Sequence, residues 1–497
     1  MKTPFLFPAW RETAAAIAIG VALHAQTPLP VTPAPMAPSG VPGTRSIPKI
    51  QAELCANCHG ANWEGGRAPT MLDETWAHGG TDEELARSIR DGSPANGMPP
   101  FAPVLTAPEI RGLVIHIREA RTRARLAPLS PPREIADQSI STELYPIKLE
   151  VIASGLETPW GIAFLPDGRM LVTERPGRLR IVEIGRGVIA SISGLPKPWV
   201  KQDGGLLDVM LHPDYARNGW VYLSYTETGG SEPDASSTRV IRGRIRNGAF
   251  VDQQTIFQPP PTLYWNSNIH FGCRLFFDRD GYLFFSIGDR GHRDDAQDLA
   301  SPYGKLHRVF DDGRVPPGNP FVNRAGAVRS IYSYGHRNQQ GIAQHPVTGE
   351  IWTSEHGPRG GDELNVIAAG HNYGWPVITY GMNDDSTPIT DLTAKEGMEQ
   401  PVLAWTPSIA VGALEFYTGD KFPLWKNHLF AACLKSNQLR RIVLDGHKVV
   451  HEEMVFRDLG RVRDVVTGPD GFLYLSLNTA FADSPGQIVR LVPAAKK

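Results

Sequence analysis

A paired-strand pattern that returns six times after residue 147 limits the fold more than any other feature of this sequence. Each copy has an apolar run, a turn with Asp-Gly, Thr-Gly or a relative, and a second alternating run, which is typical of a β-hairpin. The copies are AFLPDGRMLVTE from 163, MLHPDYARNGWVYLSY from 210, LFFDRDGYLFFSIGD from 275, IAQHPVTGEIWTSEHG from 342, FYTGDKFPLWKNHLFAACL from 416 and VVTGPDGFLYLSLNT from 465. A repeat of roughly 58 residues has room for four strands and their loops. The sequence therefore predicts a six-bladed β-propeller, with a plain β-sandwich as the alternative.

Residues 49–122 have a different pattern, which is helical. Thr81 and Glu84 form a capping-box signature before the segment LARSIRDG. Thr106 and Glu109 repeat this signature before IRGLVIHIREA. We expect a small all-α domain in front of the propeller.

The remaining segments predict an exported protein with two linkers. Residues 1–25 have a basic start and a short apolar run, as in a cleaved signal peptide; an N-terminal anchor helix is the alternative. The Pro-rich residues 26–48 and the Pro- and Ser-bearing residues 123–146 predict linkers, and the propeller takes residues 147–497. No later stretch has the ~18 apolar residues of a membrane helix, so we expect a periplasmic or secreted protein that is not an integral membrane protein. The net charge of −2 gives no reason to expect nucleic-acid binding.

The helical domain contains the motif Cys55-Ala-Asn-Cys58-His59. In a CxxCH motif both cysteines bind haem covalently and the histidine ligates the iron, so Cys55, Cys58 and His59 predict a haem c site. A zinc site would need a second ligand pair, and the domain has no further cysteine. A thioredoxin-type redox pair would need a βαβ pattern. The motif therefore favours a cytochrome c domain.

The second iron ligand is predicted to be Met98. It stands in the segment Asn-Gly-Met-Pro-Pro, where glycine and proline favour an extended loop. This setting resembles the ligand loop of small class I cytochromes c; Met71 is the competing candidate. A His/Met pair raises the haem potential and suits an electron acceptor.

Reactive and cationic side chains stand near the hairpins of several propeller repeats. His270 precedes the third hairpin, Arg337 the fourth, Lys435 follows the fifth, and Arg461 and Arg463 precede the sixth. An isolated histidine or a pair of arginines on one strand usually has a structural role. In a closed ring, however, these side chains could converge on the central channel, where several cations would require a multiply charged anion.

Over about residues 150–485 the sequence resembles the soluble quinoprotein glucose dehydrogenase and aldose sugar dehydrogenase family. The resemblance rests on HFGCRL at 270, GHRNQQG at 335, SEHGPRGGDELN at 354, NYGWP at 372, Leu-Lys at 434 and GRVRDV at 460. Members of that family are six-bladed propellers that bind pyrroloquinoline quinone (PQQ) and calcium. The resemblance therefore implies the same fold and the same two cofactors, in addition to haem c.

The resemblance also implies a role for each matching residue. His270 would be the general base that takes the proton of the sugar C1 hydroxyl while hydride passes to the quinone. The PQQ-binding residues would be Arg337, Asn338, Thr379, Lys435, Arg461 and Arg463. The carbonyl groups of Gly357 and Pro358 would bind the calcium that polarises the quinone. Glu363 and Tyr373 would bind a second, structural calcium.

Two details differ from the family pattern. Where members commonly have Gln-Gly-Gly-Leu-Leu, this chain has Gln202-Asp203-Gly-Gly-Leu-Leu, so Asp203 takes the place of the glutamine that approaches the sugar. Gln202 and Asp203 are therefore the predicted substrate residues, with an altered preference. Cys273 stands where glycine is common, and Cys433 is near Lys435. These two cysteines are either small buried apolar residues or a disulfide, since sequence does not supply their distance.

These features together predict a quinohaemoprotein that oxidises an aldose sugar at C1 to its lactone. Hydride would pass to PQQ, and electrons would continue to the fused haem and then to a downstream cytochrome or respiratory-chain component. One alternative is a PQQ-dependent dehydrogenase of sorbosone or another aldehyde. A non-catalytic propeller that binds glycans or protein, and a lactonase-type hydrolase, are further alternatives.

Overall fold

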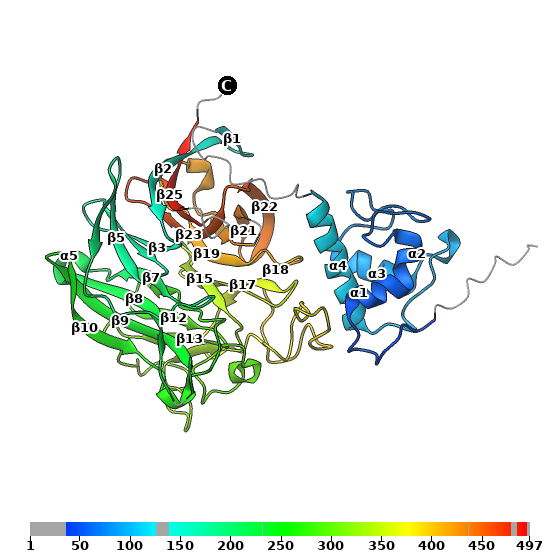
Figure 1. Cartoon of the computed structure of the whole chain (residues 1–497), viewed down its shortest axis with the longest axis horizontal. Coiled ribbons are helices and arrows are strands. Elements are labelled where there is room, and N and C mark those ends of the chain that lie inside the picture. Colours follow the sequence, from blue (N-terminus) through cyan, green and yellow to red (C-terminus); the bar gives the residue numbers. More distant parts are fainter. Residues whose placement is uncertain (1–35, 126–138, 231, 436, 479–484, 495–497) are drawn as a thin grey trace, which may run out of the picture.

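The chain has a small helical module joined to a large ring of β-sheets (Figure 1). This computed structural model describes residues 36–125, 139–230, 232–435, 437–478 and 485–494. The predicted signal peptide, residues 26–35 of the first predicted linker and residues 126–138 of the second lie outside these residues. Within the described residues, no helix is both long enough and apolar enough to cross a membrane.

The helical module is built on three main helical segments. Its elements are α1 (Ile47–Ile50), η1 (Gln51–Cys55), α2 (Ala56–His59), α3 (Asp82–Asp91), η2 (Pro94–Asn96) and α4 (Ala107–Arg125). The first three are continuous, and α1 packs against α4 where Ile47 reaches Gly112. Arg45 precedes α1 and is buried in a salt bridge with Glu109, so the described residues just before α1 belong to this module.

The two predicted capping boxes differ in the structure. At the start of α3, Thr81 Oγ1 accepts the N–H of Glu84 at 3.2 Å, and the Glu84 carboxylate accepts the N–H of Thr81 at 2.9 Å. Before α4 only half of the box forms: Glu109 accepts the N–H of Thr106, while the buried Thr106 hydroxyl has no hydrogen-bond partner among the described residues. Here Glu109 also binds the guanidinium of Arg45 at 2.7 Å.

The β-domain is a six-bladed propeller, as predicted. Each blade is an antiparallel sheet, five of them with four strands and the last with five. The first three blades are β3 (Pro159–Phe164), β4 (Met170–Glu174), β5 (Arg178–Glu183), β6 (Gly187–Ile192); β7 (Leu206–Leu211), β8 (Trp220–Thr228), β9 (Ser236–Arg246), β10 (Ala249–Phe257); and β11 (Leu275–Phe277), β12 (Leu283–Ile287), β13 (Lys305–Val309), β14 (Ile331–Tyr334). The next two are β15 (Gln339–Gln344), β16 (Ile351–Glu355), β17 (Asp362–Ile367), β18 (Leu403–Trp405); and β19 (Val411–Phe416), β20 (Leu429–Cys433), β21 (Gln438–Asp445), β22 (Lys448–Arg457). Short helical turns between strands are α5 (Tyr215–Asn218), η3 (Pro261–Leu263), η4 (Arg293–Ala296) and η5 (Pro423–Trp425).

The last blade closes the ring by combining the two ends of the domain. Its strands are β23 (Arg461–Thr467), β24 (Leu473–Asn478), β25 (Gly486–Pro493), β2 (Pro146–Leu156) and β1 (Ser139–Ser141). Strand β2 pairs with β25 from Ile147↔Pro493 to Leu156↔Gly486. Strand β1 lies within the segment predicted as the second linker.

Each predicted hairpin forms the first two strands of one blade. Glycines such as Gly168 and Gly281 have φ near +80°, the left-handed conformation that such turns require. The fifth turn is an exception, because Gly419 does not have a positive φ. There the chain forms η5, and Asn427 takes the left-handed conformation with φ +65°.

The first strands of the blades surround a central channel. Residues of β3, β7, β11, β15, β19 and β23 line one cavity of about 260 Å³. Most residues of β3, β7, β15 and β19 are buried, and those of β11 and β23 are buried or half-buried.

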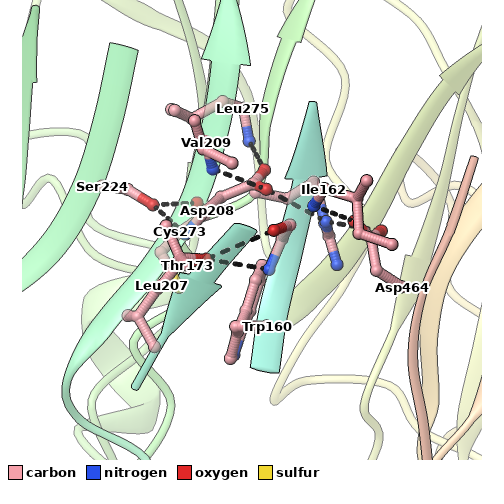
Figure 2. A network of polar contacts seen from close by, with 12 residues as sticks. Trp160, Ile162, Thr173, Leu207, Asp208, Val209, Ser224, Cys273, Leu275 and Asp464 are labelled. Carbon is pink, nitrogen blue, oxygen red and sulfur yellow. Dashed lines mark hydrogen bonds and ion pairs between the residues drawn. The ribbon is translucent and has the colours of Figure 1, made fainter. Parts of the chain in front are cut away.

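A buried ionic network crosses the channel. Arg274 Nη1 donates to Asp208 Oδ1 at 3.2 Å and to Asp464 Oδ1 at 3.0 Å. The other oxygen of Asp208 accepts the N–H of Leu275, and that of Asp464 accepts the N–H of Ile162, as Figure 2 shows. The network thus ties four blades together, including the last blade to the first.

Candidate active site

A second cavity of about 730 Å³ borders this network, because Leu207 and Cys273 in its wall directly precede Asp208 and Arg274. Its walls come from strands of several blades, including β23, and from the loops next to them. The lining includes Trp160, Arg175, Gln202, Asp203, Phe271, Cys273, Asn338, Gln340, His356, Leu434, Arg461 and Arg463. The structure therefore brings together both predicted substrate residues and three of the six predicted PQQ-binding residues.

Arg461 and Arg463 give this cavity its positive charge. Both are half-buried on β23, and the enclosed Nε of each has no hydrogen-bond partner within the described residues. Burial, and next the charge of Arg461, lowers the pKa of Arg463 to about 9. Burial also lowers the pKa of Arg461. Two arginines held this way fit an anionic group with several oxygen atoms.

His270 forms a hydrogen-bonded pair with a buried carboxylate. Its Nδ1 lies 2.6 Å from Oδ1 of Asp289, which is fully buried, and Oδ2 of Asp289 accepts the indole N–H of Trp375 at 2.7 Å. Because an ionised carboxylate only accepts, the hydrogen is on Nδ1 and the lone pair of His270 is on Nε2. Burial, and next the charge of Arg337, lowers the pKa of His270, while Asp289 opposes this shift. A neutral imidazole with a free Nε2 can take a proton.

The loop that carries His270 is strained. His270 has φ +54° and Cys273 has φ +78°, in a region that side chains rarely occupy. The N–H of His270 donates to Asp203 at 3.3 Å, and Asn338 Oδ1 accepts the N–H of Gly272 at 3.0 Å. These contacts hold His270 at the border of the cavity, next to a predicted substrate residue and a predicted cofactor residue.

The predicted calcium carbonyls lie beside Arg337. Arg337 Nη1 donates to the carbonyl of Gly357 at 2.8 Å, and the carbonyl of Pro358 accepts from Ser408 Oγ at 2.9 Å. Each carbonyl oxygen thus already accepts one hydrogen bond and has one further lone pair, and calcium binding here stays a prediction. Among the described residues, no group of three or more His, Cys, Asp or Glu side chains could hold a metal ion.

Four other predicted residues lie outside the cavity wall. Lys435 is exposed next to Leu434, and Thr379 is buried with its hydroxyl accepting the N–H of Gly381. Glu363 pairs across β16 and β17 with Glu355; burial, and next the charge of Glu355, raises the pKa of Glu363 to about 8. The Tyr373 hydroxyl donates to the carbonyl of Val366 at 2.7 Å.

In the helical module the haem motif lies at the end of the first helical segment. Cys55 and Cys58 are free and partly buried, and the enclosed Nδ1 of His59 has no hydrogen-bond partner among the described residues. Two free thiols followed by an imidazole fit covalent haem attachment. Met98 and Met71 both pack against the module's core, and Met98 is fixed by two backbone hydrogen bonds with Ser93 at 2.8 and 3.1 Å.

The two propeller cysteines do not form a disulfide. Cys273 and Cys433 are buried, free thiols. Burial raises the pKa of Cys433 to about 12 and also raises that of Cys273. Of the two alternatives left open by the sequence, the structure has small buried apolar residues.

Sequence patterns assigned no role to several residues of the site. Asp289 and Trp375 fix the orientation of His270, while Arg175 and His356 line the cavity. Asp289 and Trp375 belong to the segments Gly-Asp and NYGWP that accompany the propeller hairpins. Their partners are 19 and 86 positions away, so no spacing rule could connect them.

Comparison with known proteins agrees with this arrangement. Residues 156–490 match the family described as Glucose / Sorbosone dehydrogenase, and residues 43–117 match that of cytochrome C oxidase, cbb3-type, subunit III. Aldose sugar dehydrogenase YliI of Escherichia coli (strain K12) is 42% identical over 353 residues, which cover 70% of this chain and 93% of that protein. A PQQ-bound aldose sugar dehydrogenase from Streptomyces coelicolor has 28% identity and a TM-score of 0.57, covering 73% of this chain and all of that one. The CcoP subunit of Rubrivivax gelatinosus cbb3-type oxidase is 39% identical over 62 residues, 12% of this chain and 20% of that protein.

The fold and the cavity define a six-bladed propeller with a deep cationic site next to a buried His–Asp pair. The chain belongs to the Glucose / Sorbosone dehydrogenase family and carries an N-terminal cytochrome c domain of the cbb3 type.

Proposed function

We propose that this protein is an exported, PQQ-dependent aldose sugar dehydrogenase that passes electrons from the sugar to its own haem c. The observation that carries the proposal is the pair of half-buried arginines, Arg461 and Arg463, in the same cavity wall as Asp203, with His270 at its border. A non-catalytic binding propeller has no need for a buried imidazole that is oriented by a carboxylate.

PQQ has three carboxylates, which match the cationic part of the cavity. Arg461 and Arg463 would hold these groups, and Asn338 would contact the quinone end, next to His270. When bound, PQQ accepts the hydride, and calcium, if present, withdraws charge from the quinone oxygens. The relative from Streptomyces coelicolor, which is described as PQQ-bound, supports this assignment.

His270 would act as the general base. Its Nε2 would take the proton of the sugar hydroxyl, while Asp289 stabilises the imidazolium that forms. The low pKa of His270 keeps the imidazole neutral at physiological pH. Asp203, exposed at the cavity mouth, would hydrogen-bond sugar hydroxyl groups.

The proposal is tested by reconstituting the purified protein with PQQ and calcium. Aldoses and sorbosone are added anaerobically while the haem absorbance is followed. We expect haem reduction by at least one aldose, and a rate about 10²- to 10⁴-fold lower for His270→Ala. Haem that stays oxidised with every aldose would contradict the proposal; reduction by sorbosone alone would identify an aldehyde dehydrogenase instead.

A further inference from the structure

One face of helix α4 contacts the propeller. Arg111 Nη2 donates to the carbonyl of Thr390 at 2.8 Å, and Ile115 packs directly on Gly360. Glu119 receives the guanidinium of Arg359, whose Nε lies 2.9 Å from Glu119 Oε1. Positions four and eight residues apart share one side of a helix, so these contacts form a continuous surface. We call Arg111, Gly112, Ile115 and Glu119 the docking face.

Propeller residues also complete the core of the helical module. Met382 is 2% exposed and belongs to the apolar cluster that contains Ile47, Ile50 and Leu113. Its sulfur reaches Gly112, where any larger side chain would reduce the space. The N–H of Ile47 also donates to the carbonyl of Ser386 at 3.0 Å. The contact therefore combines a buried apolar core with hydrogen bonds, as stable protein interfaces do.

The ion pair at this contact is largely buried. The side chain of Glu119 is 8% exposed and that of Arg359 is 21% exposed. Although burial acts to raise it, the pKa of Glu119 is lowered by the hydrogen bonds from Arg359 and by the charges of Arg359 and Lys435. Breaking such a pair by changing one partner leaves an uncompensated charge, at a much larger cost than losing a surface pair.

The docking face meets the propeller on the loop that follows His356, a residue of the cavity wall. Arg359 directly follows Gly357 and Pro358, the predicted calcium ligands, and Lys435 is a predicted PQQ-binding residue. Figure 1 shows α4 on the side of the helical module that faces the propeller. The contact lies on the loop that borders the candidate active site.

Helix α4 also connects the docking face with the haem motif. His116 stands one turn before Glu119, and its Nδ1 accepts the indole N–H of Trp63 at 3.3 Å. The Trp63 ring lies 5.9 Å from the ring of His116 and 6.1 Å from that of His59. Trp63 is 2% exposed with φ +68°, a strained conformation that only tight surroundings maintain.

We propose that the docking face of α4 holds the cytochrome domain on the propeller loop that contains Arg359, beside the cofactor site. The Glu119–Arg359 ion pair is the main polar contact of this interface. The partner of this surface is therefore the propeller of the same chain. This docked arrangement is the one that serves transfer of electrons between the two domains. The last statement rests on the proposed function; the docking itself does not.

The docking is tested by small-angle X-ray scattering of the haem-loaded full chain without PQQ. We expect Glu119→Arg and Arg359→Glu each to increase the radius of gyration, and the double variant with both changes to restore the wild-type value. Asp91→Arg, a charge reversal at an exposed position of the same domain, should leave the value unchanged. Single reversals that scatter like the wild type would overturn the proposal. Should Glu119→Arg fail to take up haem, Arg359→Glu carries the test alone.

A second measurement separates docking from catalysis. After reconstitution with PQQ and calcium, the single reversals should slow haem reduction by sugar at least about tenfold and leave reduction of a soluble dye unchanged. Equal rates of haem reduction in variants and wild type would contradict a role of the docked state. If the wild type reduces neither haem nor dye, the proposed function fails, and the scattering result still decides the docking.

Discussion

At the scale of single residues, the hydrogen bond between His270 and Asp289 determines the tautomer and the orientation of the imidazole. One oxygen of Asp289 accepts the N–H of His270 Nδ1, and the other accepts the indole N–H of Trp375. The carboxylate is held by Trp375 and in turn fixes the orientation of the imidazole. The positive φ of His270 adds backbone strain that the surrounding contacts must maintain. The side chain is thus held in one tautomer and one direction before any substrate binds.

Asp289→Asn should keep the fold but reduce kcat/KM by about 10²- to 10⁴-fold. The asparagine amide can donate to Nδ1 and would favour the tautomer whose hydrogen is on Nε2. Losing the carboxylate also lowers the pKa of His270 further, so the acid limb of the pH–rate profile should move to lower pH. Asp295→Asn is the control, because Asp295 accepts the indole N–H of Trp265 away from the cavity. Equal losses in both variants would indicate a structural effect only.

Arg463→Met should stabilise the protein without cofactor and weaken PQQ binding. Arg463 forms no salt bridge among the described residues, so its burial costs free energy, and an apolar replacement of similar length removes that cost, on the order of 1–3 kcal/mol. Thermal unfolding with and without PQQ measures both effects. A variant that PQQ stabilises as strongly as the wild type would show that Arg463 does not bind the cofactor.

At the scale of elements, the two capping boxes illustrate how tertiary contacts change a local motif. The box at Thr81 is complete. In the box at Thr106 only Glu109 makes its capping hydrogen bond, and the Glu109 carboxylate also binds Arg45. The same sequence signature therefore has different stabilising effects at the two helices.

Thr81→Ala should lower the unfolding free energy of the cytochrome domain by about 1 kcal/mol. Thr106→Ala should change it much less, because the Thr106 hydroxyl makes no hydrogen bond among the described residues. Denaturant unfolding followed by Soret absorbance compares the two variants. A larger loss for Thr106→Ala would contradict this difference.

Strand β19 places a carboxyl group in the central channel. Burial raises the pKa of Glu415 to about 7, so the folded protein binds this proton more tightly than the unfolded chain does. The stabilising contribution is complete below the usual pKa of 4.5 and is lost as the pH rises toward 7. Glu415→Gln should therefore remove about 3 kcal/mol of pH dependence between pH 4.5 and 7, measured by denaturant unfolding. Glu396→Gln at the surface should leave the dependence as it is.

At the scale of the whole molecule, the ring is closed by strand β2. It pairs with β25 and buries Ile147 and Leu149 in the core of the last blade. The Asp464 contact with Ile162 adds a second link between the last and first blades. Closure pairs β25, which would otherwise be the open edge of the last blade.

A chain that begins at residue 139 should therefore fold as a monomeric propeller, whereas one that begins at 158 should not. The shorter chain loses β2 and at least about 5 kcal/mol of apolar burial, and it exposes the edge of β25. Size-exclusion chromatography and thermal unfolding measure the difference. Similar unfolding temperatures for both chains would contradict the role of β2 in closure.

The sequence alone determined the six-bladed fold and the cytochrome c domain. This was possible because hairpins, capping boxes and the CxxCH motif are local: the chain distance between interacting residues is short, and elementary sterics connect pattern with structure. The half-formed box at Thr106 and the fifth turn at Asn427 are the places where distant contacts or a longer loop changed the local result.

Only the tertiary structure decided which of these residues meet. Asp289 and Trp375 are 86 positions apart, and Glu119 and Arg359 are 240 apart. Such pairs form because ring closure and domain docking fix the positions of whole elements, and no periodicity in the sequence encodes those positions. For the same reason, the sequence predicted only that Arg461 and Arg463 share one face of a strand. The tertiary structure shows that both are half-buried and line a cavity.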